Sequence, residues 1–298
     1  MLGRAAVPQL VAAGHEVIAV ARSGSDATRL ASTGAVPRLV DLFDPPSVNA
    51  AMGGVEAVVH YATSIPPQKA MANRNAWQTN DRLRSDATSI LVDAAVANDV
   101  SRFVQQSITF TYADGGNAWL DETAPIAPTW EVLESALDAE ATVDRFRASG
   151  RTGVTLRLSR LYGPGPASAD YVASVADRKL PVVGDGQNYV SSLHIHDAAT
   201  ATLAALTAPS GTYNVSDDEP QRAAEDTTTL AELLGAPAPR RVPRWLAKLV
   251  AGDPIMLLTT SQRILNSRFK EATGWEPKFP SASAGWRDVV VNSRGIER

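Results

Sequence analysis

The chain has no cysteine among its 298 residues. This absence excludes disulfide bonds, thiolate zinc sites and cysteine nucleophiles together. Basic residues are not in excess either, because 28 lysines and arginines stand against 32 aspartates and glutamates, a formal net charge of -4. Nucleic-acid-binding proteins normally show a basic surface, so we expect no nucleic-acid partner.

Long apolar runs are missing as well. No uninterrupted apolar stretch is long enough to span a bilayer, and the N-terminus lacks the charged start, apolar centre and cleavage site of a signal peptide. We therefore expect a cytoplasmic protein with no membrane partner. The apolar fraction of 44% and the charged fraction of 20% are typical of a globular protein with a sizeable core.

What the sequence does contain is a regular alternation of helices and buried strands. Residues 3–13 predict a helix that ends at Gly14, and residues 15–21 predict a strand rich in Val and Ile. Further strands are predicted at 35–40, 57–61, 102–110 and from 153, and further helices at 46–52, 76–97 and 131–149. This order predicts an α/β fold, a doubly wound, Rossmann-like parallel sheet with helices on both faces.

The alternation stops near Pro164, where Pro, Gly and Asp become frequent. Residues 1–165, with a return at about 189–208, are expected to form the main domain. Residues 166–188 and 209–298 are expected to form a smaller, substrate-binding lobe. Two lobes imply a cleft between them, which is the usual place for a substrate in a doubly wound fold.

Several motifs, in a fixed order along the chain, carry a resemblance to a known family. They are LGR at 2–4, VDLFDP at 40–45, AVVHYAT at 57–63, SRFVQQS at 101–107, LRLSRLYGPG at 156–165 and VSSLHIHDAA at 190–199. On these motifs the sequence resembles an extended short-chain dehydrogenase/reductase of the NAD(P)-dependent epimerase/dehydratase type, over nearly its whole length. The resemblance implies that the main domain binds a dinucleotide.

Members of this family begin with a strand and a GxxGxxG turn. Gly3 matches the last glycine of that turn, so the first strand and the first two glycines are expected upstream of Met1. Two explanations stay open. Either Met1 is an internal residue of a longer chain, or the protein has given up its dinucleotide and binds no cofactor.

The resemblance also implies which residues meet the cofactor. NAD-specific relatives place an acid at the end of the second strand, where this chain has Ala21 followed by Arg22 and Ser23. An arginine suits a ribose 2′-phosphate, because its planar fork pairs with phosphate through two hydrogen bonds. We therefore expect NADP(H) rather than NAD(H).

Two further pairs of residues complete the expected cofactor site. Asp41 and Leu42 match the family pair that meets the adenine. Ala62 and Thr63 follow the fourth strand of the family fold, where the backbone would pass the cofactor phosphates and ribose.

The catalytic YxxxK motif of the family is absent. The resemblance aligns Val132 with the tyrosine, Ala136 with the lysine and Ile108 with the usual Ser or Thr, and the segment 130–146 contains neither Tyr nor Lys. In the family the tyrosine exchanges a proton with the substrate, and the lysine lowers the tyrosine pKa. Trp130 is expected to form an apolar wall beside the vacant tyrosine position.

Other side chains are candidates for a substitute proton donor. They are Tyr112, Tyr162 and Glu134, and also Glu131, which lies three residues before Glu134. For both tyrosines the alternative is a structural role in the family loops, and for both glutamates it is a solvated helix face.

Two other features are weighed against a site. His194 and His196 lie two residues apart with no third ligand evident, so we expect no metal site and expect Asp197 to cap the next helix. A basic cluster of Arg240, Arg241 and Arg244 precedes an amphipathic helix. It is expected to be solvated surface, with an anionic substrate or a partner as alternatives.

The sequence therefore predicts an NADP(H)-linked oxidoreductase or epimerase-like protein, which acts on a small carbonyl or hydroxyl compound without the usual Tyr/Lys pair. Two alternatives stay open: a non-redox isomerase, lyase or cyclase that uses the same cleft, and a catalytically silent NADP(H)-sensing protein. Many relatives pair through the two helices that match 76–97 and 131–149, which implies a homodimer as one arrangement.

Overall fold

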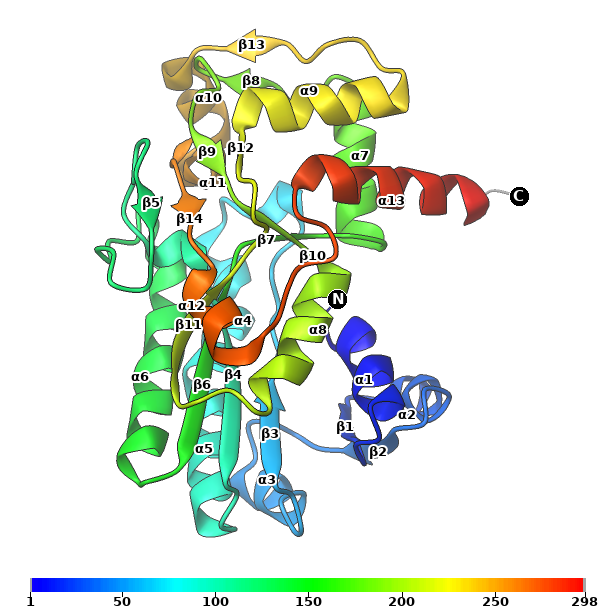
Figure 1. Ribbon diagram of the computed structural model, residues 1–298, viewed down its shortest axis with the longest axis vertical. Coiled ribbons are helices and arrows are strands. Elements are labelled where there is room, and N and C mark those ends of the chain that lie inside the picture. The colour runs from blue at the N-terminus through cyan, green and yellow to red at the C-terminus, as the bar shows by residue number, and fades with distance from the viewer. Residues whose placement is uncertain (1, 297–298) are drawn as a thin grey trace.

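A parallel four-stranded sheet forms the centre of the computed structural model, which describes residues 2–296 (Figure 1). Its strand order is β11–β6–β4–β3. The strands are β3 (Ala57–His60), β4 (Arg102–Ile108), β6 (Thr152–Leu158) and β11 (Gly211–Val215). Val104, Val154 and Leu156 are fully buried, as expected for strands that are covered on both faces.

Helices cover both faces of this sheet. One face packs against α1 (Leu2–Ala12), α8 (Ile195–Ala205) and α12 (Ser267–Thr273). The other packs against α3 (Pro45–Ala50), α5 (Asp86–Ala97) and α6 (Glu134–Ala148). The predicted α/β fold with a parallel sheet is therefore confirmed.

A second parallel sheet stands apart from the first. It contains only β1 (Ile18–Ala21) and β2 (Val36–Leu39), which are joined by α2 (Gly24–Ala31), and β1 has no hydrogen-bonded ladder with β3. Val20 and Leu39 are 44% and 67% exposed, unusually open for apolar strand residues. The parallel strands thus form two separate sheets, and the gap between the sheets lies between β1 and β3. The strand expected ahead of Met1 lies outside the described residues.

Two predicted elements are interrupted. The helix expected over 76–97 is broken at Ser85 into α4 (Gln78–Arg84) and α5, and the Ser85 hydroxyl donates to the carbonyl of Asp81. The strand expected from 153 leaves the main sheet at Ser159, after which β7 (Arg160–Tyr162) pairs with β10 (Ser192–His194). The expectation of one continuous helix was therefore wrong, and the loop expected after the strand from 153 contains the short strand β7.

Apart from the main sheet and the helices that cover it, the chain after Pro164, where a smaller lobe is expected, is built from short elements. They are α7 (Pro166–Ala176), β8 (Val182–Val183), β9 (Tyr189–Val190), β12 (Gln221–Arg222), α9 (Ala223–Leu234), β13 (Arg241–Val242), α10 (Arg244–Ala251), α11 (Met256–Thr259), β14 (Arg263–Ile264) and α13 (Ala282–Ile296), with β14 paired to β5 (Trp119–Leu120). The expected boundary at 209 does not follow the hydrogen bonding, because β11 pairs with β6 in the main sheet. Within residues 2–296, no helix has both the length and the apolar character needed to cross a membrane.

Candidate functional site

The residues expected at the cofactor lie where strands β1, β2 and β3 end. Arg22 and Ser23 follow β1, and the register places Ala21 beside Leu39 of the parallel strand β2. Asp41 therefore leaves β2 at the same edge as Arg22 leaves β1. Gly3 lies in the first turn of α1, where an added Cβ would meet nothing within 4 Å. At this edge of the strands, the charged residues Arg22 and Asp41 lie at the strand ends, and Gly3 has open space beside it.

Arginines surround a single carboxylate at the end of β1. Asp26 accepts a hydrogen bond from Arg29 at 2.8 Å, and Arg22 stands 3.8 Å from it with 89% of its side chain exposed. The hydrogen bond from Arg29, with the positive charges of Arg29, Arg22 and Arg4, lowers the pKa of Asp26. Three cations around one anion leave a net positive site, which suits a phosphate. Arg4 and Arg29 were not found from the sequence.

Ser23 and Asp41 shape the backbone of this edge. The Ser23 hydroxyl accepts from the amide of Asp26 and caps α2. Asp41 accepts from the amide of Phe43 at 2.9 Å, so its carboxylate closes the turn after β2. Leu42 packs on the cluster that includes α3 and α5. Both polar groups thus hold local turns in addition to any contact with a ligand.

Asn80 of α4 fixes the loop that follows β3. Its side chain is completely buried, and its oxygen accepts from the amide of Ser64, next to the expected residues Ala62 and Thr63. Its amide nitrogen has no partner among the described residues. A buried donor without an acceptor is costly, so it marks a place for an acceptor atom of a ligand. The residues at this edge therefore fit a dinucleotide.

The positions aligned with the catalytic pair are part of the packed interior. Val132 and Ala136 are each 1% exposed. Val132 belongs to a group of apolar side chains that we call the Trp130 cluster: Trp77, Trp130, Val132 and Leu133, with Met71, Ile108, Phe110 and Leu257 against them. Trp77 and Trp130 meet edge to face with ring centroids 5.1 Å apart. No hydroxyl or ammonium replaces the family pair at these two positions.

The hydroxyl side chains at the end of β4, beside this cluster, form hydrogen bonds away from the vacant catalytic positions. Ser107 donates to Glu140 of α6, and Thr109 donates to Gln262. Ile108, aligned with the family Ser or Thr, packs against the Trp130 cluster. Strand alternation turns Ser107 away from the side of Ile108. Thr109 does not follow this alternation, because β4 ends at Ile108 and Thr109 begins a 3-10 helix, where its hydroxyl is bound to Gln262.

Glu140 anchors a buried polar network that includes Tyr112. Arg157 of β6 binds both carboxylate oxygens of Glu140, at 3.0 and 2.6 Å, and donates to the Tyr112 hydroxyl at 2.8 Å. The Tyr112 hydroxyl in turn donates to Asn214 of β11 at 2.8 Å. Burial raises the pKa of Tyr112, which is 0% exposed. The network ties α6 to three neighbouring segments of the main domain.

The other two candidates for a proton donor lie apart from this network. Tyr162 is 2% exposed and packs against His194 and Trp286, and burial raises its pKa. Glu134 is an exposed residue of the first turn of α6, and its neighbour Glu131 pairs with Arg74 at 3.1 Å. The structure does not bring Tyr112, Tyr162 and Glu134 into one site.

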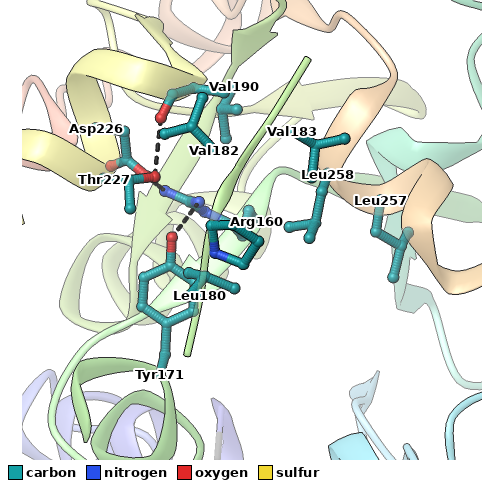
Figure 2. Close-up of a pocket in the computed structure, with 12 residues that line it drawn as sticks. Arg160, Tyr171, Leu180, Val182, Val183, Val190, Asp226, Thr227, Leu257 and Leu258 are labelled. Atoms are coloured by element: carbon teal, nitrogen blue, oxygen red, sulfur yellow. Dashed lines mark hydrogen bonds and ion pairs between the residues drawn. The ribbon is translucent and has the colours of Figure 1, made fainter. Parts of the chain in front are cut away.

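A small cavity lies between β7, α7, α9 and α11, on the lobe side of the Trp130 cluster. Figure 2 shows Arg160 between Asp226 and the Tyr171 hydroxyl, and its guanidinium lies 2.7 Å from the Asp226 carboxylate. The cavity has a volume of about 30 Å³, enough for about one water molecule. Leu257 lines both the cavity and the Trp130 cluster, so the two adjoin.

The two histidines of the HIHD motif serve the start of α8. His194 caps the helix, because its Nδ1 accepts from the amide of His196. The expectation that Asp197 is the cap was wrong, since its carboxylate accepts from the amides of Lys278 and Phe279 at 2.9 and 3.0 Å. In the part of the chain that the structure describes, no three ligating side chains are grouped as a metal site.

Known proteins share both the sequence and the shape of this chain. The chain is 36% identical to a 3-diazoavenalumate denitrifying reductase from Streptomyces, over 97% of this chain and 95% of the relative. It is 29% identical to a 2-alkyl-3-oxoalkanoate reductase from Stenotrophomonas maltophilia, over 79% and 73%. Among solved structures, the UDP-glucose 4-epimerase of Thermotoga maritima has a TM-score of 0.80 at 19% identity, with 100% and 97% of the two chains covered.

A second solved structure carries the cofactor expected of this fold. The UDP-glucose 4-epimerase of Thermus thermophilus in complex with NAD has a TM-score of 0.77 at 23% identity, over 99% of this chain and 96% of the other. At this identity the likeness shows the shared fold. The profile of the NAD dependent epimerase/dehydratase family matches residues 1–216. The chain thus belongs to the NAD dependent epimerase/dehydratase family, whose members use NAD(P).

Proposed function

We propose that the chain is an NADP(H)-dependent reductase that delivers hydride to a small, electron-poor substrate without a proton from the protein. The observation that carries this proposal is the burial of Val132 and Ala136, at the positions where the family resemblance implies a tyrosine and a lysine. A carbonyl that accepts hydride becomes an alkoxide and must then be protonated. A substrate that needs no proton suits a site without those two groups.

When bound, NADPH supplies the hydride. The 2′-phosphate would lie at Arg22, with Arg4 and Arg29 contributing charge around Asp26. The unpartnered amide of Asn80 would donate to an acceptor of the cofactor beside the loop after β3. These residues bind and orient, and they take no part in proton transfer.

An arene diazonium is the substrate class that we propose. The Streptomyces relative is named as a reductase that denitrifies a diazo compound. In such a reduction the carbon–nitrogen bond breaks as dinitrogen leaves, hydride forms the new carbon–hydrogen bond, and NADPH is oxidised to NADP⁺. No proton enters this balance. The buried edge-to-face pair of Trp77 and Trp130 makes the surroundings of the vacant catalytic positions aromatic and apolar, which suits an arene better than a group that must be protonated.

Isotope labelling tests the reductase proposal. The purified chain is incubated with an arene diazonium salt, or with an aryl ketone of the same size, and NADPH deuterated at the transferred position. We expect dinitrogen release, and one deuterium at the carbon that held the nitrogen. The same reaction in D₂O with unlabelled NADPH should leave the product free of deuterium. Turnover of the ketone alone, or solvent deuterium at that carbon, would contradict the proposal.

The preference for NADP(H) is tested by Arg22→Ala. A hydrogen-bonded charge contact contributes about 1.5–3 kcal/mol, so NADPH should bind about 10- to 100-fold more weakly. The affinity for NADH should stay unchanged, because NADH has no 2′-phosphate. Lys179→Gln, on an exposed side chain of the smaller lobe, is the matched loss of one charge and should alter neither affinity. An equal loss for both nucleotides would instead indicate a structural role for Arg22.

A further inference from the structure

Helix α10 presents most of its surface to solvent, at a corner of the smaller lobe in Figure 1. Trp245, Leu249 and Val250 are 71%, 78% and 81% exposed, and Leu246 is 36% exposed. Residues 245 and 249, and likewise 246 and 250, are four apart and so form two neighbouring rows. Ala247 is the one buried residue of the helix, and it packs on Val183 and Ile255. Ala251 is partly buried against the same cluster, and the four larger apolar side chains of the helix are exposed.

Cations border these apolar rows. Arg244 and Lys248 form a third row on α10, and Arg240 and Arg241 precede the helix. None of these four side chains has an ion pair within residues 2–296, and the segment 236–252 contains no Asp or Glu. The chain as a whole has a net charge of -4, so this positive patch is local. We call the four cations and the four exposed apolar residues the α10 patch.

We propose that the α10 patch docks the protein on an anionic lipid surface. A short helix with Trp and aliphatic residues on one face and Arg and Lys beside them is suited to the interface of a negatively charged membrane. The patch departs from the sequence-based expectation of no membrane partner, because docking of this kind needs no membrane-spanning segment. The proposal is independent of the reductase reaction.

Protein partners fit the α10 patch less well. A symmetric dimer through the patch would bring two sets of four cations together across the two-fold axis. A stable protein interface buries about 800 Å² on each partner, from about 20–30 residues. The α10 helix has only eight residues, and it offers four exposed apolar side chains. A lipid surface needs neither shape complementarity nor an opposing pocket.

Docking by α10 would bring a membrane close to the small cavity. Val183 touches Ala247 of α10 and also lines the cavity that holds Arg160. Leu258 likewise belongs to both groups. Val183 and Leu258 therefore lie between the helix that would face the lipid and the cavity that holds Arg160.

Sedimentation with vesicles tests the proposal. The full chain is mixed with vesicles of phosphatidylcholine, with or without phosphatidylglycerol, at low and at high salt. We expect binding only to the vesicles with phosphatidylglycerol, and weaker binding at high salt. Each cation near the surface contributes about fivefold, so Arg244→Gln with Lys248→Gln should weaken binding about 25-fold. Leu249→Ser with Val250→Ser should also release the protein.

Matched variants elsewhere separate docking from general changes of surface. Val291→Ser on α13 removes an apolar side chain that is 69% exposed, and Lys179→Gln removes a cation of the same lobe. Both should bind as the unchanged chain does. Circular dichroism and NADPH oxidation should be the same for all variants in the absence of vesicles. Three results would overturn the proposal: no binding to anionic vesicles, equal loss in the control variants, or a dimer abolished by Leu249→Ser without any vesicle binding.

Discussion

Asp217 is a buried acid whose ionisation links the stability of the fold to pH. Its side chain is 2% exposed, one oxygen accepts from Ser192 and Ser216, and the other has no partner among the described residues. Burial, with the nearby charge of Asp226, raises the pKa of Asp217 to about 8. In the unfolded chain the same acid ionises near pH 4. Between these values the folded protein holds one proton that the unfolded chain releases.

This bound proton sets the direction in which stability changes with pH. A raised carboxyl pKa gives stability that is present below the unfolded pKa and is lost as pH rises toward about 8, at about 1.4 kcal/mol per pH unit. Asp217→Asn should remove this loss. The free energy of unfolding of the variant, relative to that of the unchanged chain, should therefore rise steadily from about pH 4 to about pH 8. Urea unfolding at a series of pH values measures the difference. Asp138→Asn, at an exposed position of α6, is the control; identical pH profiles for all three chains would contradict the assignment.

At the same scale, the sequence was informative about what the site lacks. The loss of Tyr and Lys at Val132 and Ala136 can be read directly from residue identity. The arginines around Asp26 could not be found, because Arg4 and Arg29 come from two helices whose packing is not visible in a linear pattern. The candidate contacts at Asp41, Leu42, Ala62 and Thr63 remain predictions, since they need a ligand to test them.

At the scale of elements, the sequence predicted which segments form helices and strands better than it predicted where they stop. At the break, the Ser85 hydroxyl donates to the carbonyl of Asp81. A hydrogen bond of this kind cannot be predicted from the spacing of apolar residues. The cap of α8 shows the same limit. Asp is a favoured capping residue, yet Asp197 lies in the first turn of α8 because its carboxylate binds a distant loop, and His194 takes the cap.

Asp197 is therefore expected to hold the loop at 278–279 against α8. Asp197→Ala leaves two backbone amides without an acceptor, and hydrogen bonds to a buried charge contribute about 1.5–3 kcal/mol each, so the free energy of unfolding should fall by about 3–6 kcal/mol. Asp197→Asn keeps one acceptor and should lose less. Urea unfolding of both variants checks this order. A loss below about 0.5 kcal/mol in Asp197→Ala would show that the loop is held by other contacts.

At the scale of the whole molecule, the two parallel sheets are stabilised very differently. The main sheet has helices on both faces and fully buried strands, including Phe103, Val104 and Val154. The β1–β2 pair has a small cluster of its own, formed by Ala19, Ala21, Leu30 and Ala35 against α1 and α2. A two-stranded sheet is marginal alone. The sequence suggested this division through the family's expected first strand, and the structure places the division between β1 and β3.

Native-state hydrogen exchange should reveal the difference. Amides of β1 and β2 should open without global unfolding and exchange on the order of 100-fold faster than those of β4 and β6, because fewer buried contacts are broken when they open. NADPH should slow exchange in β1 and α2, since its binding at Arg22 would stabilise the closed form of that unit in proportion to its occupancy. Exchange in β6 should change far less. Equal protection of β1 and β6 without nucleotide would mean that the two sheets unfold as one cooperative unit, and that the divided sheet is not a point of weakness.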